Sequence, residues 1–312
     1  MPDAGYVLRR LLQMVPTLTF ILVVTFVLVR LLPGDPLSAI AGDRVTDAQV
    51  AQARAAYGLD QPVLVQFGLY VKRVITGDLG RSLIAQVPVW TLVGQRLPPT
   101  LLLTGMATGI AVALAVPLAF ISALRRGRAS DLVIRGAFQI GLSMPVFYIG
   151  LVLLTVFSAQ LRWFPVGGYG DGWGDRVYHL FLPALTLGVS LAAVLMRNLR
   201  SAIIDVLGAE YVDFARAKGL APRIVLTRHV LRNALISTVA LLGPTVGTLL
   251  GGAVITEAVF AIPGVGRLMI DSIYGRDYPV IQGLSLTLAL VVSLVFLLTD
   301  LLQAALDPRT AG

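Results

Sequence analysis

The sequence predicts an all-α membrane protein that crosses the bilayer several times. Of its 312 residues, 56% are hydrophobic and 13% are charged, whereas a soluble domain carries about 25% charged residues. The mean hydropathy is +0.83, and the apolar residues gather in six long runs. We therefore expect one transmembrane domain over residues 1–312, built from six membrane-spanning helices.

Each apolar run approaches the ~20 residues that a helix needs to cross ~30 Å of hydrocarbon. Five runs contain a proline, which membrane helices tolerate because neighbouring helices satisfy the freed carbonyl groups, so we expect kinks there. The expected spans are Leu11–Val29, Thr100–Leu124, Phe138–Leu161, His179–Met196, Leu235–Val259 and Val280–Leu302, and the prolines are Pro16, Pro117, Pro145, Pro183 and Pro244.

The distribution of Lys and Arg predicts the orientation. Four arginines follow the second span within the next connection and its margin, and seven Lys or Arg residues lie between the fourth and fifth spans. Short connections rich in Lys and Arg stay in the cytoplasm. We therefore expect both termini to be cytoplasmic, together with the polar stretch Asp205–Asn233. The net charge of +8 is explained by these connections and does not indicate nucleic-acid binding.

The long connection Leu32–Pro99 is expected outside the cytoplasm, with short helices of its own. Thr46 and Gln49 have capping-box spacing, and Gly58 is a helix stop. Pro62–Thr76 combines apolar residues at helical spacing with Lys72 and Arg73. We expect that second piece to lie on the membrane surface or to cover the external mouth, or to be a packed loop without direct substrate contact.

The stretch Asp205–Asn233 predicts a helix, a glycine bend and a second helix. Tyr211, Phe214, Ala215 and Lys218 fall at helical spacing on one face. Gly219 suits the left-handed turn that ends a helix, and Pro222 suits the first turn of the next. Two short helices that project from a membrane protein are expected to dock on another subunit.

Most catalytic chemistries are excluded by residue type and spacing. The only lysines, Lys72 and Lys218, do not lie in a phosphate-binding loop. The chain has no cysteine, and His179 and His229 are isolated from other metal ligands in sequence. No serine lies in a nucleophile elbow. We therefore expect no catalytic site, no metal site and no cofactor in this chain.

Ion-coupled transport is also disfavoured by the expected spans. Coupling ions and protons need ionisable groups deep in the bilayer, but Glu257 and Asp300 lie near the ends of the fifth and sixth spans. We interpret both as structural residues. The free energy for transport is then expected to come from a partner ATPase on the cytoplasmic side.

The stretch Asp205–Asn233 resembles the cytoplasmic loop of permease subunits of binding-protein-dependent ABC importers. That loop has an acidic residue, two small residues and a glycine six positions after the acid, and Asp213, Phe214, Ala215 and Gly219 occupy these positions. Phe214 departs from the small residue, and Val230-Leu231-Arg232-Asn233 replaces the Ile-x-Leu-Pro end of the general pattern.

Further motifs match the dipeptide/oligopeptide branch of that family over nearly the whole chain. They are YVDFARAKGL with RHVLRNAL, LLPGDP (Leu31–Pro36), GLDQP (Gly58–Pro62), GDLGRS (Gly77–Ser82), RLPPT (Arg96–Thr100), LPALTLG (Leu182–Gly188), GGAVITEAVFAIPGVGRL (Gly251–Leu268), RDYPVIQG (Arg276–Gly283) and ALDPR (Ala305–Arg309).

The resemblance implies the type I ABC importer permease fold in a bacterial cytoplasmic membrane. Its implied partners are a second homologous permease, two cytoplasmic ATPase subunits that bind ATP and Mg, an extracytoplasmic solute-binding protein and the lipid bilayer. The implied cargo is a dipeptide or oligopeptide. Nickel, heme, glutathione or a sugar stays an alternative, as does a self-sufficient transporter, channel or membrane enzyme.

Two groups of residues are expected to carry the function. One is the ATPase-coupling surface, which the resemblance places in the cytoplasmic loop; the other is a glycine stripe, whose four-residue spacing lets helices approach closely. The coupling residues are Tyr211, Asp213, Phe214, Ala215, Arg216, Ala217, Lys218, Gly219 and Leu220, and the helix-packing residues are Gly243, Gly247 and Gly251.

Overall fold

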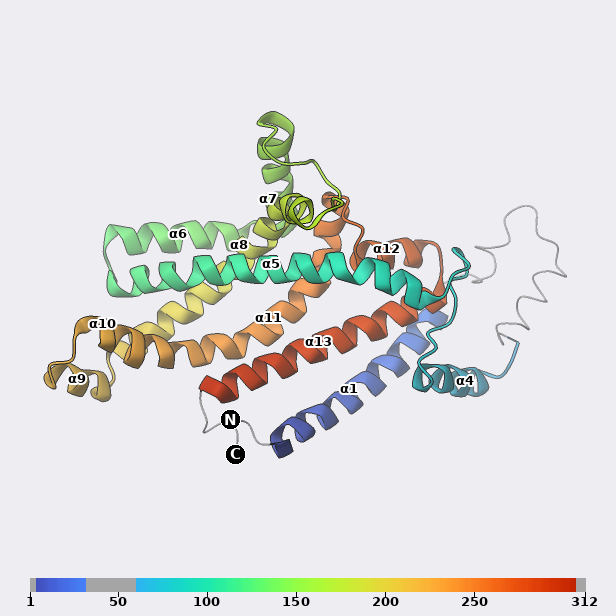
Figure 1. Cartoon of the computed structure of the whole chain (residues 1–312), viewed down its shortest axis with the longest axis horizontal. Coiled ribbons are helices and arrows are strands. Elements are labelled where there is room, and N and C mark those ends of the chain that lie inside the picture. The colour runs from blue at the N-terminus through green and yellow to red at the C-terminus, as the bar shows by residue number, and fades with distance from the viewer. Residues whose placement is uncertain (1–3, 32–59, 307–312) are drawn as a thin grey trace.

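The computed structural model describes residues 4–31 and 60–306, and this part of the chain is helical and contains no strand. Figure 1 shows the long helices running along the longest axis of the molecule. The elements are α1 (Ala4–Leu31), α4 (Val63–Ile75), α5 (Val89–Leu124), α6 (Ala129–Ser143), α7 (Val146–Leu153), the π-helical η2 (Leu154–Gln160), α8 (Trp173–Leu207), α9 (Glu210–Ala217), α10 (Pro222–Ile224), the π-helical η3 (Val225–Leu231), α11 (Arg232–Val259), α12 (Val265–Tyr274) and α13 (Tyr278–Leu306).

The predicted membrane fold is confirmed. Within the described residues, five helices are long and apolar enough to cross a bilayer, and a sixth crossing results if the bent pair α6 and α7–η2 counts as one span. Helices α5 and α8 extend well beyond the predicted apolar runs, to 36 and 35 residues. Pro98 and Pro99 stand directly before the second predicted run, yet they lie inside α5 and do not end it.

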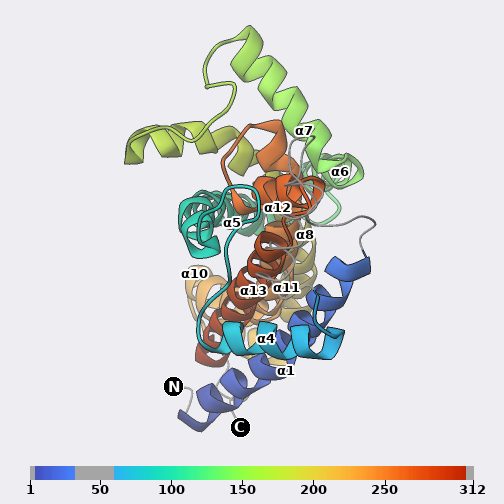
Figure 2. The same cartoon turned by 90° about the vertical axis from the view of Figure 1, so that its right-hand side faces the viewer.

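The kink predicted at Pro145 in the third span, Phe138–Leu161, is confirmed, but it is a full break between two helices and not a bend within one helix. Helix α6 ends at Ser143, and the α7–η2 helix starts after Pro145 at an angle of 103° to α6. Proline lacks an N–H donor and disfavours the helical conformation in the residue before it. Met144 accordingly has an extended backbone, with φ −88° and ψ 135°. In Figures 1 and 2, α7 lies at the edge of the molecule opposite α1.

Helices α5 and α8 form the most extensive helix–helix contact in the structure. A row of alanines at four-residue spacing on α5, Ala107, Ala111, Ala115 and Ala119, is 0–1% exposed. Gly188 of α8 lies so close that an added Cβ would be 3.0 Å from the Ala107 carbonyl oxygen. Small residues let two membrane helices approach closely, and van der Waals contact is the main force that holds them together in lipid. Sequence reasoning identified the glycine stripe on α11 but missed this longer alanine row.

Two buried carboxylates join segments at the end of the bundle that holds α4 and α12. Glu257 of α11 is fully buried; it accepts hydrogen bonds from the Thr100 hydroxyl of α5 at 2.5 Å and from the Arg267 N–H of α12 at 3.0 Å. Asp277, just before α13, accepts from the Ser82 hydroxyl and from the Leu83 N–H at 3.0 Å. A buried charge needs such donors. These hydrogen bonds support the structural role expected for Glu257, which stays a prediction.

The second amphipathic piece forms α4, close to its predicted bounds. The rings of Phe67 and Tyr70 pack on Phe26 of α1, with centroids 5.0 and 5.8 Å apart, and Arg30 lies 3.4 Å above the Phe26 ring. Leu64 and Ile75 remain on the outer surface, 84% and 79% exposed. An apolar outer face agrees with a place on the membrane surface, which stays a prediction. The capping box at Thr46 and Gln49 and the helix stop at Gly58 lie outside the described residues.

The packing role of the alanine row can be tested with one substitution in the row and a control substitution on the opposite side of α5. Ala115→Leu should destabilise the protein by about 1–3 kcal/mol, because the larger side chain separates α5 from α8. Ala113→Leu, on the exposed side of the same helix, should have little effect. The readout is the thermal stability of the purified protein in mild detergent, followed as loss of the monodisperse fraction. Equal stability of the two variants would refute the role of the row.

Candidate functional site

Helix α9 forms a short surface element between two membrane helices. Glu210 and Asp213 lie in its first turn, where negative charge is favoured by the helix dipole. Its end is a Schellman motif: the Gly219 N–H donates to the Arg216 carbonyl at 2.9 Å, and the Leu220 N–H donates to the Ala215 carbonyl at 3.3 Å. Gly219 has φ +76°. The predicted left-handed glycine bend is therefore confirmed.

The inner face of α9 is fixed in a hydrophobic cluster. Val212 and Ala215 are 0% and 5% exposed, and they share that cluster with Val225 and Val230 of η3 and with residues of α5 and α8, including Ile203. The expectation that Ala215 lies on the docking face is thus wrong, because its side chain faces the protein. The sequence cue was Val212, an apolar residue three positions earlier on the same side of the helix.

The outer face of α9 and of the bend is apolar at its centre and charged around it. Tyr211, Phe214, Leu220 and Ile224 are 45%, 62%, 37% and 45% exposed. The Lys218 ammonium lies 4.6 Å from the centre of the Phe214 ring, which holds that ring in place. Beside it, Arg216 pairs with Asp213 at 3.0 Å, and Ala217 and Gly219 are also exposed. Exposed aromatic residues within a polar rim are typical of protein interfaces.

The second arm of the predicted helix–glycine–helix unit is not a separate short helix. Pro222 starts it, as predicted, but α10 and η3 continue without a break into α11. No glycine or proline stands between Ile224 and Arg232 to end the helix. The Asn233 amide of α11 donates to the Tyr211 hydroxyl of α9 at 3.2 Å. The bend is therefore connected directly to a membrane-spanning helix.

A buried ion pair, missed by sequence reasoning, fixes the same end of the bundle. Asp131 of α6 is 1% exposed and accepts from the Ser122 hydroxyl of α5 at 2.5 Å and from Arg200 of α8 at 2.9 and 3.0 Å. It also accepts from the Gly127 N–H at 3.0 Å. The sequence feature that could have indicated this ion pair is an aspartate that closely follows several arginines. These bonds join α5, α6 and α8 next to the cluster that holds α9.

The glycine stripe on α11 lies beside α13 over part of its length. A Cβ added to Gly243 would be 2.7 Å from the Thr299 hydroxyl oxygen, and one added to Gly247 would be 3.4 Å from Val292. Nothing lies within 4 Å at Gly251. Gly243 and Gly247 thus have the close neighbour that a packing role requires, whereas Gly251 does not. That these glycines are required for assembly of the transporter stays a prediction.

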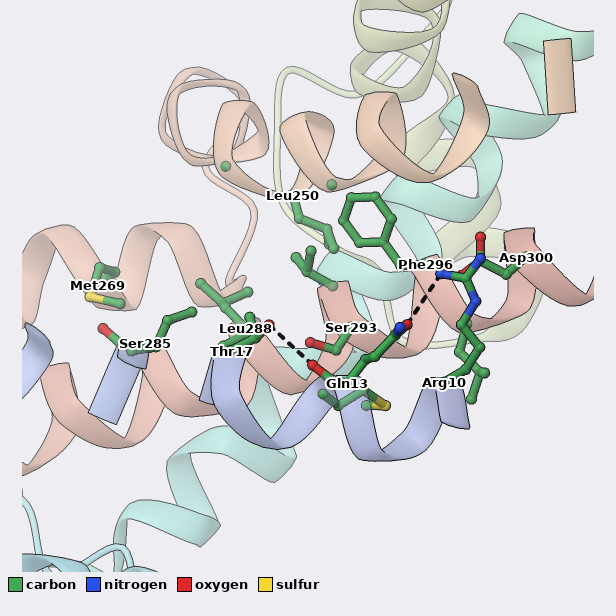
Figure 3. A pocket seen from close by; sticks show the side chains of 17 residues that line it. Arg10, Gln13, Thr17, Leu250, Met269, Ser285, Leu288, Ser293, Phe296 and Asp300 are labelled. Atoms are coloured by element: carbon green, nitrogen blue, oxygen red, sulfur yellow. Dashed lines mark hydrogen bonds and ion pairs between the residues drawn. The ribbon is translucent and has the colours of Figure 1, made fainter. Parts of the chain in front are cut away.

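Gly247 and Gly251 also line a groove between α1, α11 and α13, with a volume of about 610 Å³. Figure 3 shows Arg10 and Asp300 at one end of it and Met269 at the other. Arg10 pairs with Asp300 at 3.1 Å. This pairing supports the structural interpretation of Asp300, and the groove walls are otherwise mostly apolar.

The described residues contain no candidate metal site. No group of three His, Asp or Glu side chains in residues 4–31 and 60–306 has the geometry to hold a metal ion. His179 lies beside Asp175 of its own helix, at 3.2 Å. The exposed apolar residues of α9, the bend and α10 form the candidate functional site.

Two family models match almost the whole chain. The model described as "Binding-protein-dependent transport system inner membrane component" matches residues 115–312. A second model, for the N-terminal part of the membrane component of such systems, matches residues 4–104.

Curated relatives match over nearly their full length. The glutathione transport system permease protein GsiC of Salmonella typhi is 42% identical over 304 residues, which is 97% of this chain and 98% of that protein. The protein of the same name from Escherichia coli K12 is 42% identical over 305 residues, with the same coverage.

Solved structures support the same fold. A chain of the MetNI methionine ABC transporter in an inward-facing conformation has a TM-score of 0.58 at 19% identity, and the match covers 69% of this chain and 96% of that chain. A second crystal form of that transporter has a TM-score of 0.56, also at 19% identity, and covers 70% and 97%. At this identity, the match is one of fold.

The buried ion pair yields a prediction with an internal control. Asp131→Asn leaves Arg200, whose side chain is 15% exposed, without its counter-charge, which should cost up to about 3–5 kcal/mol of stability. Asp213→Asn removes an equivalent carboxylate from a pair whose side chains are 50% and 69% exposed, so its cost should stay within about 1 kcal/mol. Thermal unfolding of the two purified variants tests this difference; similar losses in both would contradict it.

Proposed function

We infer the finer function from one premise: this chain belongs to the family of binding-protein-dependent transport system inner membrane components. It is therefore a membrane-spanning permease subunit of an ABC importer, with the fold of type I permeases. As a family of transport subunits, these proteins work with ATPases and solute-binding proteins. The substrate, the coupling residues, the stoichiometry and the orientation go beyond this premise, and we propose them below.

We propose that the cargo is a short peptide, with glutathione as the favoured candidate. The observation that supports this is the 42% identity, over 97% of this chain, to permeases of glutathione transport systems. Glutathione is one of the alternatives to the dipeptide or oligopeptide cargo implied by the sequence, and because it is a tripeptide it is chemically close to that class. Nickel, heme and sugars are the less favoured alternatives.

We propose that the outer face of α9 and the bend docks on a cytoplasmic ATPase subunit. Phe214 and Tyr211 would be the apolar anchors, because aromatic residues at the centre of an interface carry much of the binding energy. Asp213, Arg216, Ala217, Lys218 and Leu220 would form the surrounding contacts. Ala215 would contribute from beneath, since its side chain fixes α9 to the membrane helices.

The proposed assembly contains a second, homologous permease, two ATPase subunits and an extracytoplasmic solute-binding protein. In this assembly ATP and Mg are bound by the ATPase subunits, and this chain needs no cofactor.

We propose that α9 and both termini face the cytoplasm of a bacterial cell, across its cytoplasmic membrane. The arginine-rich connection 125–128 and the basic residues of α9 and α10 lie at the same end of the bundle, as Figure 1 shows. Cysteines placed at Lys218 and at Gly172, where a side chain meets no other atom within 4 Å, test this orientation in sealed cells. Labelling of position 218 from outside would contradict it.

Gly219→Val should leave the protein in the membrane but loosen the ATPases or uncouple hydrolysis from uptake. The left-handed backbone at Gly219 costs roughly 1–2 kcal/mol for a residue with a Cβ. No atom lies within 4 Å of an added Cβ, so the effect comes from the backbone. Gly219→Asn should be tolerated much better, because asparagine visits this conformation more easily. Membrane level, ATPase co-purification and uptake are measured together; normal retention and uptake in Gly219→Val would exclude the proposed coupling role.

The substrate proposal is tested by the ATPase activity of the reconstituted importer with its own solute-binding protein. Glutathione and short peptides should stimulate hydrolysis above the basal rate, and nickel, heme and sugars should not. The same preparation without the binding protein serves as the control. Stimulation by nickel or heme alone, with no response to any peptide, would overturn the peptide class while leaving the importer assignment intact.

A further inference from the structure

A basic cavity lies between α6 and α8, away from the coupling surface. Its volume is about 380 Å³, and Arg135, Arg197 and Arg200 line it together with Gln139 and Ser201. Arg197 and Arg200 are about one turn apart on α8, and Arg135 comes from α6. Three arginines thus converge from two helices on one small space.

The charges around this cavity do not balance. Asp131 is the acidic partner: it binds Arg200 at 2.9 Å and lies 4.0 Å from Arg135. Its remaining acceptor positions are used by the Ser122 hydroxyl and the Gly127 N–H. Arg197 is exposed and makes no hydrogen bond or ion pair with the described residues 4–31 and 60–306. Three positive groups therefore face one negative group, and the cavity attracts an anion.

The rest of the surroundings is apolar, which restricts the kind of anion. Leu132, Phe138, Leu142 and Met196 complete the cavity wall. On the adjacent surface of α6, Val133 and Ile140 are 70% and 64% exposed. A free, fully hydrated anion gains nothing from these side chains, whereas acyl chains pack against them.

We propose that this cavity binds the phosphate headgroup of an anionic phospholipid, with the acyl chains lying along the outer face of α6. Arg135 and Arg197 would hold the phosphate, while Arg200 remains paired with Asp131. Arginines near a membrane interface pair with lipid phosphates, and basic pockets between membrane helices on the cytoplasmic side bind anionic headgroups. The choice of the cytoplasmic leaflet rests on the orientation proposed above. The proposal that the cavity binds an anionic headgroup does not depend on that orientation.

The proposed lipid would sit beside the junction that carries α9. Asp131 and Arg200 connect α5, α6 and α8, and Arg200 of this ion pair also lines the cavity. An anionic headgroup would offset the repulsion between the three arginines and so stabilise this end of the bundle. The composition of the leaflet would then influence the stiffness of the coupling region.

The test compares lipid retention by the intact importer in nanodiscs that contain phosphatidylglycerol or only phosphatidylcholine. Arg135→Gln/Arg197→Gln should retain phosphatidylglycerol roughly 100-fold more weakly, since each hydrogen bond from a guanidinium group to the bound phosphate contributes about a factor of ten. Arg125→Gln/Arg126→Gln removes the same charge from exposed positions outside the cavity and should retain the lipid as the wild type does. Arg135→Lys/Arg197→Lys should restore most of the binding.

Each outcome decides the proposal. Selective loss in the Gln double variant, with an intact complex by size-exclusion chromatography and rescue by Lys, supports it. Equal loss in the Arg125/Arg126 control shows a general surface effect and overturns it. Displacement of the lipid by millimolar inorganic phosphate, without preference for phosphatidylglycerol, assigns the cavity to a free anion and also overturns it. Absence of bound lipid in the wild-type complex would do the same, as when a partner permease fills the cavity.

Discussion

The hydrophobic cluster that joins α9 to the ends of α5 and α8 is the contact on which the proposed function depends. Val212 and Ala215 are buried there with Val225 and Val230, beneath a bend whose backbone geometry is set by Gly219. A surface helix can transmit displacement only if it moves together with the helices behind it. Because the second arm continues directly into α11, a push on α9 would reach two membrane helices without crossing a flexible linker.

Buried carboxylates connect the parts of the chain that the sequence presents as separate motifs. RLPPT meets GGAVITEAVFAIPGVGRL because Thr100 donates to Glu257, and GDLGRS meets RDYPVIQG because Ser82 and the Leu83 N–H donate to Asp277. A buried carboxylate is costly to leave without donors, so changing one member of each pair affects both motifs. This gives a physical reason for these motifs to occur together in one chain.

The sequence predicted most of the fold, since long apolar runs have few alternatives in a bilayer. It also predicted the conformation of Gly219, because a left-handed residue after a helix favours glycine strongly. It did not predict the 103° bend after Ser143, since Pro145 indicates a kink whose size depends on how the two helices pack. Likewise, helical spacing grouped Ala215 with Phe214, but which side of α9 is buried depends on the contact with α5 and α8. Asp131 was overlooked because only the basic residues of its connection informed the orientation.

The rigid connection between α9 and α8 is tested most directly by a distance measured in the working importer. The native chain contains no cysteine, so spin labels can be placed at Val177 near the start of α8 and at Ala217 at the end of α9, both of which are exposed. Pulsed electron paramagnetic resonance then gives the distance between the labels without nucleotide and with a trapped ATP-bound state. If α9 moves as one body with α8, the mean distance and its spread stay the same in both states. A change in the mean distance, or a clear broadening on ATP binding, would contradict a rigid coupling element.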